Sequence, residues 1–179
     1  MNEDLIEKKV NSQDVYDGCL LHVKCDTVRL PNGKLATREW VQHPGAAAVL
    51  PILPDGDIIL VKQYRYPIER VTLEIPAGKL DSPEEEPLAC ASRELGEETG
   101  YQAEDFKKIL TLATTVGFSN EKIHIFFDQG LHPGVQHPDD DEFINVVKMP
   151  LTKAFELIQS GEIMDAKTIA AILWKMAKQ

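Results

Sequence analysis

Cysteines and long apolar runs are what this 179-residue chain has least of. Its three cysteines, Cys19, Cys25 and Cys90, are too few and too scattered to predict a disulfide framework or a zinc site. No segment approaches the roughly 20 apolar residues of a membrane-spanning helix. The first twenty residues alternate polar and apolar side chains and contain no signal-peptide core. We therefore expect no membrane span and take the cytoplasm as the default compartment, with export by an unusual route left open.

Basic residues are also scarce relative to acidic ones. The chain has 19 Lys and Arg against 29 Asp and Glu, which gives a net charge of −10. This balance argues against nucleic acids and anionic membranes as partners, because they would be repelled by an acidic surface. A small anionic ligand stays possible where metal ions or a local basic pocket neutralise the site. With 43% apolar and 27% charged residues, the composition is that of a globular protein of about one domain.

The pattern of apolar residues predicts strands first and helices last. Within residues 5–43, strands are expected at 20–25 and 27–30, ahead of the hairpin turn Pro31-Asn32-Gly33, and at 37–42. Further strands are expected at 45–53, 58–63, 108–113, 122–127 and 145–148, and helices at 87–99, 152–160 and 165–178. This order predicts a mixed α/β sandwich rather than a doubly wound sheet. Residues 129–142 are the longest stretch without an expected element.

Carboxylates are densest between residues 81 and 98. On the helix expected to begin at Pro87, Glu94, Glu97 and Glu98 stand at positions i, i+3 and i+4 and so share one face. Like charges at this spacing repel by a few tenths of a kcal/mol per pair, so a cation is needed to offset them. Hard carboxylate oxygens suit Mg²⁺ or Mn²⁺. Taken alone, the pattern also fits a charge-rich helix face in solvent.

The segment resembles the Nudix box, the signature of hydrolases that act on nucleoside diphosphates linked to another moiety. In that pattern Gly is followed after five residues by Glu, and after seven more by Arg-Glu-apolar-any-Glu-Glu-any-Gly-apolar. Counted back from Arg93, the first Glu is Glu85, six residues after Gly78 rather than five. We interpret this departure as a one-residue insertion around Ser82-Pro83. The matching positions are Gly78, Arg93, Glu94, Leu95, Glu97, Glu98, Gly100 and Tyr101.

This resemblance implies a Nudix-type α-β-α sandwich with a mixed sheet. It implies Glu94 and Glu98 as metal ligands, Glu97 as a further ligand or supporting carboxylate, and the Ala77 carbonyl as a main-chain ligand. Arg93 is counted with Glu97 among the catalytic residues, and Arg93 with Glu85 is the expected structural brace. Mg²⁺, with Mn²⁺ as a possible substitute, would polarise the pyrophosphate and activate a water molecule.

Residues that flank the box resemble the branch of ADP-ribose and nucleotide-sugar hydrolases. The resemblance rests on Arg38–Ala46, Lys62–Pro67, Leu73–Gly78 and Gly117–Glu121. In that branch the additional N-terminal strands are exchanged across a homodimer. The resemblance thus implies that residues 1–43 serve dimerisation and substrate binding, whereas residues 44–179 form the Nudix hydrolase domain.

Several substrate contacts follow from the same resemblance. Trp40 occupies the place of an aromatic side chain that stacks on the nucleobase, with Arg38 beside it; an interface tryptophan is the alternative. Arg65 resembles an arginine that binds substrate phosphate, and a surface ion pair is its alternative. In this branch the general base often lies on a loop before the last strand. There Glu142 is the best match and Asp140 the second; a box glutamate and a solvated acidic loop remain alternatives.

Two sequence features bear on whether the substrate is ADP-ribose or a nucleotide sugar. ADP-ribose hydrolases tend to carry a proline about fifteen residues past the box, where this chain has Val116. Nucleotide-sugar hydrolases that resemble this chain carry Asp-any-Lys on the C-terminal helix, which Asp165-Ala166-Lys167 supplies; an N-cap and a surface lysine are the alternatives. We therefore expect a homodimeric, Mg²⁺-dependent enzyme that cleaves nucleoside diphosphate sugars to nucleoside monophosphate and sugar 1-phosphate. An ADP-ribose pyrophosphatase giving AMP and ribose 5-phosphate is the alternative, and a non-catalytic nucleotide-sugar sensor is a remote one.

Overall fold

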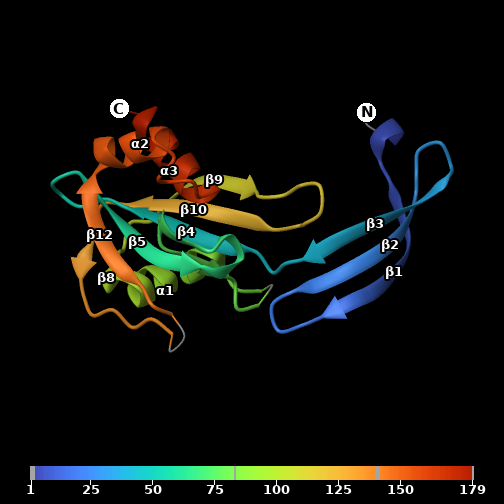
Figure 1. Ribbon diagram of the computed structural model, residues 1–179, viewed down its shortest axis with the longest axis horizontal. Coiled ribbons are helices and arrows are strands. Elements are labelled where there is room, and N and C mark those ends of the chain that lie inside the picture. The colour runs from blue at the N-terminus through green and yellow to red at the C-terminus, as the bar shows by residue number, and fades with distance from the viewer. Residues whose placement is uncertain (1–2, 83, 140–141, 179) are drawn as a thin grey trace. The chain divides into compact units, whose positions relative to one another are not determined.

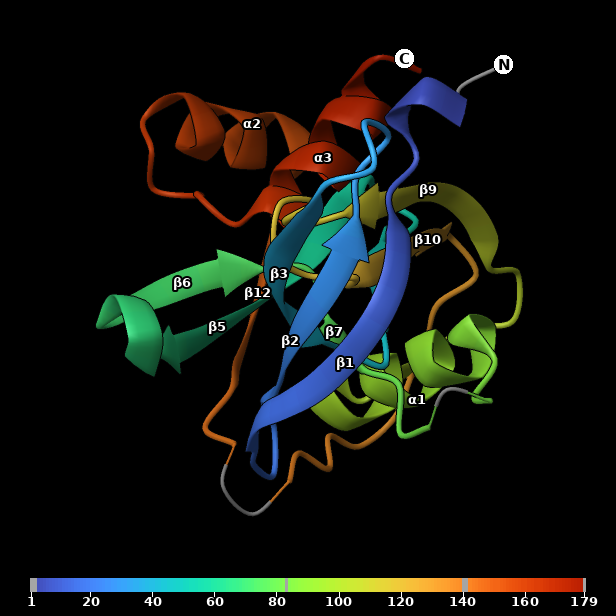
Figure 2. The ribbon, with the colours of Figure 1, turned by 90° about the vertical axis from the view of Figure 1, so that its right-hand side faces the viewer.

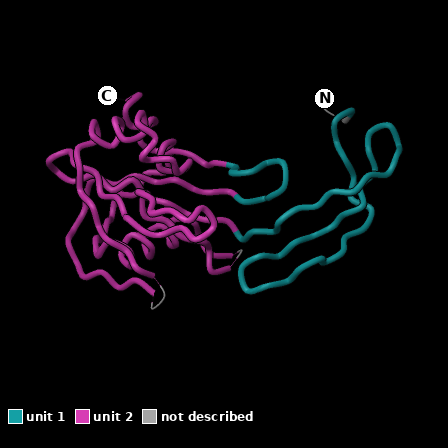
Figure 3. The backbone as a smooth tube through the Cα atoms, in the orientation of Figure 1, with its two compact units in different colours: residues 1–44, 113–121 teal, residues 45–112, 122–179 magenta. Residues whose placement is uncertain are grey.

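The computed structural model describes residues 3–82, 84–139 and 142–178 and divides the chain into two compact units (Figure 3). Unit 1 comprises Met1–Pro44 and Ala113–Glu121, and unit 2 comprises Gly45–Leu112 and Lys122–Gln179. Within the described ranges, no helix is both long enough and apolar enough to cross a membrane.

Unit 1 is built on an antiparallel sheet of three strands, β1 (Lys8–Asp17), β2 (His22–Arg29) and β3 (Leu35–Gln42), preceded by a 3₁₀ turn over Glu3–Leu5 (Figure 1). The hairpin turn between β2 and β3 contains Gly33 with φ +83°, a conformation that glycine adopts without strain. The main-chain N–H of Val41 donates to the carbonyl of Phe118 (2.7 Å) and ties the 113–121 segment to β3. All ten residues of β1 are exposed.

The expected break in the second strand was wrong. Residues 20–25 and 27–30 were predicted as separate strands, but β2 runs without interruption through Asp26. The carboxylate of Asp26 is satisfied inside the sheet, because it accepts hydrogen bonds from Ser12 on β1 and from Trp40 Nε1 on β3. The Ser12 hydrogen bond is the main cause of the lowered pKa of Asp26, against a smaller opposing effect of burial. A charged residue can therefore continue a strand where neighbouring strands supply donors.

In its described residues, unit 2 holds a mixed sheet, a second antiparallel sheet, three α-helices and a 3₁₀ helix over Tyr66–Ile68. The mixed sheet has the order β7-β4-β10-β9, in which β4 and β10 are parallel and β4 and β7 are antiparallel. The second sheet has the order β12-β5-β6, and β11 pairs with β8. The strands are β4 (Ala46–Pro51), β5 (Asp57–Arg65), β6 (Arg70–Glu74), β7 (Ala77–Lys79), β8 (Tyr101–Gln102), β9 (Lys107–Ala113), β10 (Lys122–Asp128), β11 (His132–Pro133) and β12 (Asn145–Pro150).

Strand β4 forms the centre of the hydrophobic core, and all six of its residues are buried. Ala47 and Val49 pack with Leu95 of helix α1 (Pro87–Thr99) on one side. Its alternate residues, Leu50 among them, pack with Ile172 of helix α3 (Ala166–Met176) on the other side. Figures 1 and 2 show α1 on one side of the sheets and α3 with α2 (Leu151–Gln159) on the other. The predicted α-β-α sandwich with a mixed sheet is thus confirmed.

The helix boundaries follow their sequence signals. Helix α1 begins at Pro87 and ends before Gly100, as predicted, and Gly100 has the left-handed φ of +74°. Its N–H donates to the carbonyl of Gly96 (2.8 Å), which closes the last turn. Helix α3 is shorter than predicted at both ends. Asp165 lies outside it as the N-cap and accepts a hydrogen bond from the Thr168 N–H (2.9 Å), and the helix ends at Met176 with Ala177 as the C-cap. The expected irregular stretch 129–142 contains the short strand β11.

Candidate active site

Two buried glutamates of helix α1 lie against the main chain of β7. Glu94 is 9% exposed and Glu98 is 2% exposed. The main-chain N–H of Ala77 donates to Glu98 Oε2 (2.9 Å). A Cβ atom built on Gly78 would lie 1.9 Å from Glu94 Oε1, so any other residue there would force that carboxylate to move from its place. The glycine of the box is therefore a close-approach position that brings backbone and carboxylates together.

The environment of this pair disfavours two negative charges. Burial raises the pKa of Glu98 to about 8, and repulsion from Glu94 and Glu142 adds to the effect. Burial likewise raises the pKa of Glu94 to about 7, although the adjacent Arg93 opposes the rise. Carboxylates in such surroundings are stabilised in their ionised form by a nearby cation.

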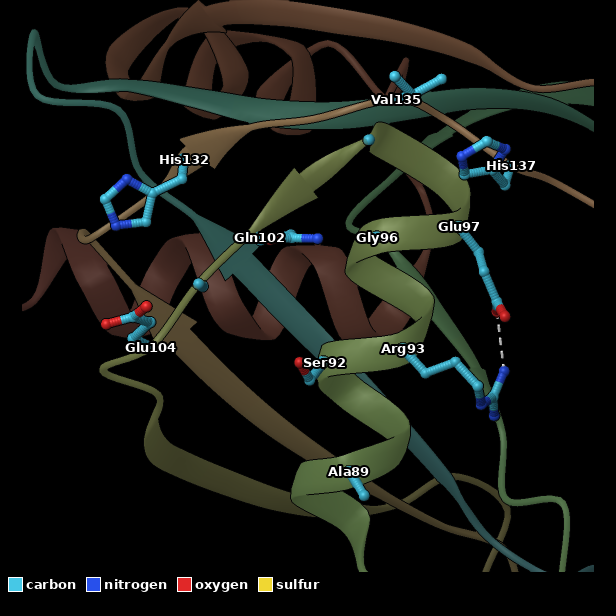
Figure 4. Close-up of a pocket in the computed structure, with 12 residues that line it drawn as sticks. Ala89, Ser92, Arg93, Gly96, Glu97, Gln102, Glu104, His132, Val135 and His137 are labelled. Carbon is cyan, nitrogen blue, oxygen red and sulfur yellow. Dashed lines mark hydrogen bonds and ion pairs between the residues drawn. The ribbon is translucent and has the colours of Figure 1, made fainter.

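Arg93 is the centre of an ion-pair network at the surface end of this site. Its Nη1 donates to Glu94 Oε1 (2.8 Å) and to Glu97 Oε2 (2.9 Å), the second of which is drawn in Figure 4. Its Nε lies 3.5 Å from Glu85 Oε1, which is the brace that the box spacing counted from Arg93 predicts. Glu85 in turn accepts a hydrogen bond from the Asp81 N–H (2.6 Å). Burial acts to lower the pKa of Arg93, but the surrounding carboxylates outweigh it and raise the pKa above its ordinary value.

The donor set fits a hard divalent cation. Among the described residues, no three His, Cys, Asp or Glu side chains form a group that could hold a metal ion by themselves. Mg²⁺ does not need such a group, because it is commonly bound through one or two carboxylates and retains several waters. The carboxylates of Glu94 and Glu98 are oxygen donors of this kind, and together with the carbonyl of Ala77 they could hold such an ion.

The predicted general base lies on a segment that is anchored to α1. Glu142 is exposed, and its negative charge contributes to the raised pKa of both Glu94 and Glu98. Asp140, the second candidate, lies outside the described residues. Upstream, Gln136 Nε2 donates to the carbonyls of Glu98 (2.7 Å) and Ile144 (3.4 Å). Gln136 and Ile144 are therefore both tied to the end of the helix that carries Glu98.

A close contact between two main-chain segments reinforces this anchor. A Cβ atom on Gly134 would lie 2.6 Å from the carbonyl oxygen of Gly100. The main-chain N–H of His137 donates to the carbonyl of Glu97 (3.0 Å). On the outer face of α1 this segment borders a cavity of about 960 Å³ that is also lined by Arg93, Glu97 and His132 (Figure 4).

Two predicted substrate-binding residues, Arg65 and Lys167, contact one buried glutamate that the sequence did not single out. Arg65 donates through Nε (2.8 Å) and Nη2 (2.7 Å) to the carboxylate of Glu74, and Lys167 Nζ contacts the same carboxylate. Asp165, the third, forms an ion pair with Lys167 (3.1 Å). A carboxylate in the apolar run Leu73-Glu74-Ile75-Pro76 was a usable signal, because a buried charge needs partners.

The opposing effects on Glu74 have a clear outcome. Burial acts to raise its pKa, but the hydrogen bonds from Arg65 and the charge of Lys167 lower it to about 2. Glu74 is therefore ionised at neutral pH. The charges of Arg65 and Lys167 also interact with Glu98, so this cluster adjoins the carboxylates of the box.

The two remaining predicted contacts lie in unit 1. Trp40 Nε1 donates to Asp26 (3.1 Å), which fixes the orientation of the indole ring. Arg38 Nε donates to Glu7 (2.9 Å), and Arg38 Nη2 contacts the other oxygen of the same carboxylate. Trp40 and Arg38 line a cavity of about 250 Å³ together with Phe118 and Asn120. Two aromatic side chains in one cavity lining, together with an amide and a guanidinium group, are suited to a planar base.

Family models match both parts of the chain. The NUDIX domain model matches residues 41–172, and the model of the nucleoside diphosphate sugar hydrolase N-terminal domain matches residues 7–41. The chain therefore belongs to the Nudix hydrolase family. It is 42% identical over 179 residues to the ADP-ribose pyrophosphatase of Bacillus subtilis (strain 168), covering 99% of this chain and 96% of that protein.

One further relative supports this assignment, and one solved structure shares the fold. The chain is 39% identical over 135 residues to the GDP-mannose pyrophosphatase of Yersinia enterocolitica, covering 70% of this chain and 69% of that protein. A crystal structure described as an ADP compounds hydrolase superposes with a TM-score of 0.83 over 97% of this chain and 94% of that one, at 24% identity. At that identity, the structural match shows the shared fold.

Proposed function

We propose that this enzyme hydrolyses the pyrophosphate bond of nucleoside diphosphate sugars, in a reaction that depends on Mg²⁺ and releases a nucleoside monophosphate and a sugar 1-phosphate. The observation that carries the proposal is the buried pair Glu94 and Glu98 against the main chain at Ala77 and Gly78. The named substrates of the two relatives, ADP-ribose and GDP-mannose, both consist of a nucleoside diphosphate joined to a sugar.

The residues of the box divide into ligands and positioning groups. Glu94, Glu98 and the Ala77 carbonyl hold the metal in this proposal, and Mg²⁺ supplies charge neutralisation for the diphosphate and acidifies water. Arg93 acts through its neighbours, because its guanidinium fixes the carboxylates of Glu94 and Glu97. Glu97 is a further ligand or a supporting carboxylate.

The proton from the attacking water is taken by a carboxylate near the metal ligands. Glu142 is the proposed base, because its charge acts on both Glu94 and Glu98 and its exposed carboxylate is open to water. Glu97 is the alternative base. Arg65, whose charge acts on Glu98, is the proposed contact of the substrate phosphate, and Lys167 and Asp165 are the other proposed substrate contacts on this part of unit 2.

Unit 1 has a proposed part in recognition. Trp40 stacks on the nucleobase and Arg38 binds beside it, and the three-stranded sheet is exchanged between the subunits of a homodimer. The exposed strand β1 and the oriented indole of Trp40 support this assignment. In this proposal, residues 1–43 of one copy mediate dimerisation. They also bind the nucleobase of a substrate held by residues 44–179 of the partner copy.

ADP-ribose is the alternative substrate, and the 42% identical ADP-ribose pyrophosphatase favours it. The two functions are separated by comparing kcat/KM for ADP-ribose, GDP-mannose and ADP-glucose, each with and without Mg²⁺. We expect hydrolysis of all three only with Mg²⁺ or Mn²⁺. A strict preference for ADP-ribose would replace the nucleotide-sugar assignment by the ADP-ribose one.

The metal assignment is tested by Glu98→Gln. Gln keeps an acceptor for the Ala77 N–H but removes the charge, so we expect kcat/KM to fall by at least about 100-fold and Mg²⁺ affinity to weaken. Glu86→Gln, at an exposed glutamate just before α1, is the matched control and should retain activity. A folded Glu98→Gln enzyme with near-wild-type turnover would disprove the proposal.

A further inference from the structure

Unit 2 contains a cavity of about 430 Å³ between the β5–β6 hairpin and the start of α3. Its wall is apolar and is formed in part by Ile68, Met164 and Ala166. Its polar side is formed by the cluster described above, Arg65, Glu74, Asp165 and Lys167. The volume falls within the range of about 300–1,000 Å³ that small-molecule sites occupy.

The polar side of this cavity carries no net charge. Two cations, Arg65 and Lys167, are paired with two carboxylates, Glu74 and Asp165. Glu74 is 2% exposed and accepts from Arg65, Lys167 and the hydroxyl of Thr72 (2.6 Å). These ion pairs are therefore part of the folded structure and are present without a ligand.

This charge balance selects against a charged occupant. A carboxylate or phosphate that entered would lose its hydration and would meet cations already neutralised by Glu74 and Asp165. A neutral group with hydroxyls forms more favourable hydrogen bonds, because the accessible side chains of the cavity include both donors and acceptors. The Arg65 side chain is 42% exposed and the Asp165 side chain is 22% exposed. The apolar wall suits the C–H face of a ring.

The cavity adjoins the proposed site of cleavage. The charges of Arg65 and Lys167 interact with that of Glu98. Glu74 is followed after two residues by Ala77, whose N–H donates to Glu98. A group attached to the diphosphate thus has a short path from the metal ligands into the cavity.

We propose that this cavity binds the sugar ring attached to the distal phosphate and that its balanced charges select uncharged sugars. The assignment rests on the proposed function and deepens it. Arg65, whose side chain is 42% exposed, then borders both the diphosphate and the sugar pocket, whereas the buried Lys167 holds Glu74 at the edge of the pocket.

The first experiment fills the cavity. Ala166 is exposed at the start of α3, so Ala166→Trp places an indole in the cavity without disturbing the core. We expect KM for GDP-mannose and ADP-ribose to rise by at least about 10-fold, because the bulky side chain excludes the ring. Hydrolysis of the methyl ester of ADP, which has the diphosphate but no second sugar, should change by less than about 2-fold. Met164→Trp serves as a second filling variant if Ala166→Trp fails to fold.

Leu173→Trp is the matched control, because Leu173 is exposed on the same helix and does not line the cavity. It should leave all substrates unaffected. Equal losses for the methyl ester and the sugar substrates, or no loss for either, would overturn the sugar pocket while leaving hydrolysis by the wild type intact. A wild-type enzyme that cleaves none of the substrates with Mg²⁺ would instead overturn the proposed function and the pocket with it.

The second experiment tests the charge balance. We expect the wild type to prefer UDP-glucose over UDP-glucuronate by at least about 10-fold in kcat/KM. Asp165→Asn keeps the helix N-cap, for which Asn is as suitable as Asp, but leaves the cavity with one positive charge. The preference should then fall several-fold in favour of UDP-glucuronate. An unchanged ratio would contradict selection by charge.

Discussion

The side-chain amide of Gln136 donates to the main-chain carbonyl of Glu98 at 2.7 Å and to that of Ile144 at 3.4 Å. Glu98 is a proposed metal ligand, and Ile144 lies two residues past Glu142, the proposed base. One side chain therefore joins the two segments whose relative placement the hydrolytic step requires. Such alignment matters because small displacements of reacting groups have large effects on rate.

Gln136→Leu is expected to lower kcat by about 10-fold with little change in KM, since it removes both hydrogen bonds and leaves substrate contacts in place. Stability should fall by about 1–2 kcal/mol, because two carbonyls lose their donor. Steady-state kinetics and urea unfolding measure the two effects. Gln129→Leu, at an exposed glutamine near the start of the same loop, is the control. If kcat is unchanged while stability falls, the link is structural only.

Removal of Arg93 should destabilise the fold through the carboxylates it leaves behind. Arg93→Met leaves Glu94 and Glu97 without their shared donor, and Glu85 without its nearby positive charge. Breaking a fully buried ion pair costs about 3–5 kcal/mol, and because Arg93 is partly exposed we expect about 2 kcal/mol. Chemical denaturation of Arg93→Met and Arg93→Lys measures the loss, with exposed Arg29→Met as the control. Equal midpoints for Arg93→Met and the wild type would refute this account.

Acid should weaken the fold through Glu74. Its pKa of about 2 lies below the ordinary value of 4.5, so its stabilising effect is complete above pH 4.5 and is lost as the pH falls through 2. The depression corresponds to at most roughly 3 kcal/mol. Glu74→Gln should therefore be less stable than the wild type at about pH 7, and the difference should shrink towards about pH 2.

Unfolding free energies of the two proteins across this range give the test. Glu39→Gln, at an exposed glutamate of unit 1, serves as the surface control and should stay within about 0.5 kcal/mol of the wild type. A difference between Glu74→Gln and the wild type that does not depend on pH would exclude the ion-pair explanation.

Tryptophan fluorescence can report base stacking, because the chain has two tryptophans and they lie in different units. Trp174 packs against Phe127 with ring centroids 5.7 Å apart, whereas Trp40 lines the 250 Å³ cavity. A non-hydrolysable nucleotide sugar should quench the wild type and Trp174→Phe but not Trp40→Phe. Trp40→Ala should weaken binding by about 10-fold, the usual size of a stacking contribution. Quenching that persists in Trp40→Phe would place the base elsewhere.

The elements predicted best from the sequence carry strong local signals. Helix α1 has Pro87 at its start and Gly100 at its end, and both act within one turn of the chain. Asp26 shows the opposite case, because its carboxylate looks like a strand breaker until the donors Ser12 and Trp40 are known. Those donors come from two other strands, so the local sequence could not reveal them.

The same distinction holds for the candidate site. The spacing of the box predicted that Glu94, Glu97 and Glu98 share one helix face, because helical periodicity alone places them near one another. Glu74 and Gln136 were missed, since their partners Lys167 and Glu98 lie 93 and 38 residues away in the sequence. Such pairs depend on tertiary packing, for which one sequence holds little direct information.

The ten exposed residues of β1 have a thermodynamic consequence for the whole molecule. Ordering a residue costs about 1–2 kcal/mol of conformational entropy, and a strand that buries no side chain recovers little of it within its own chain. If a second copy covers this sheet, as proposed, folding of unit 1 and association become a single equilibrium governed by mass action. The melting temperature would then rise with protein concentration. Dilution alone would favour unfolding of the region that carries Trp40.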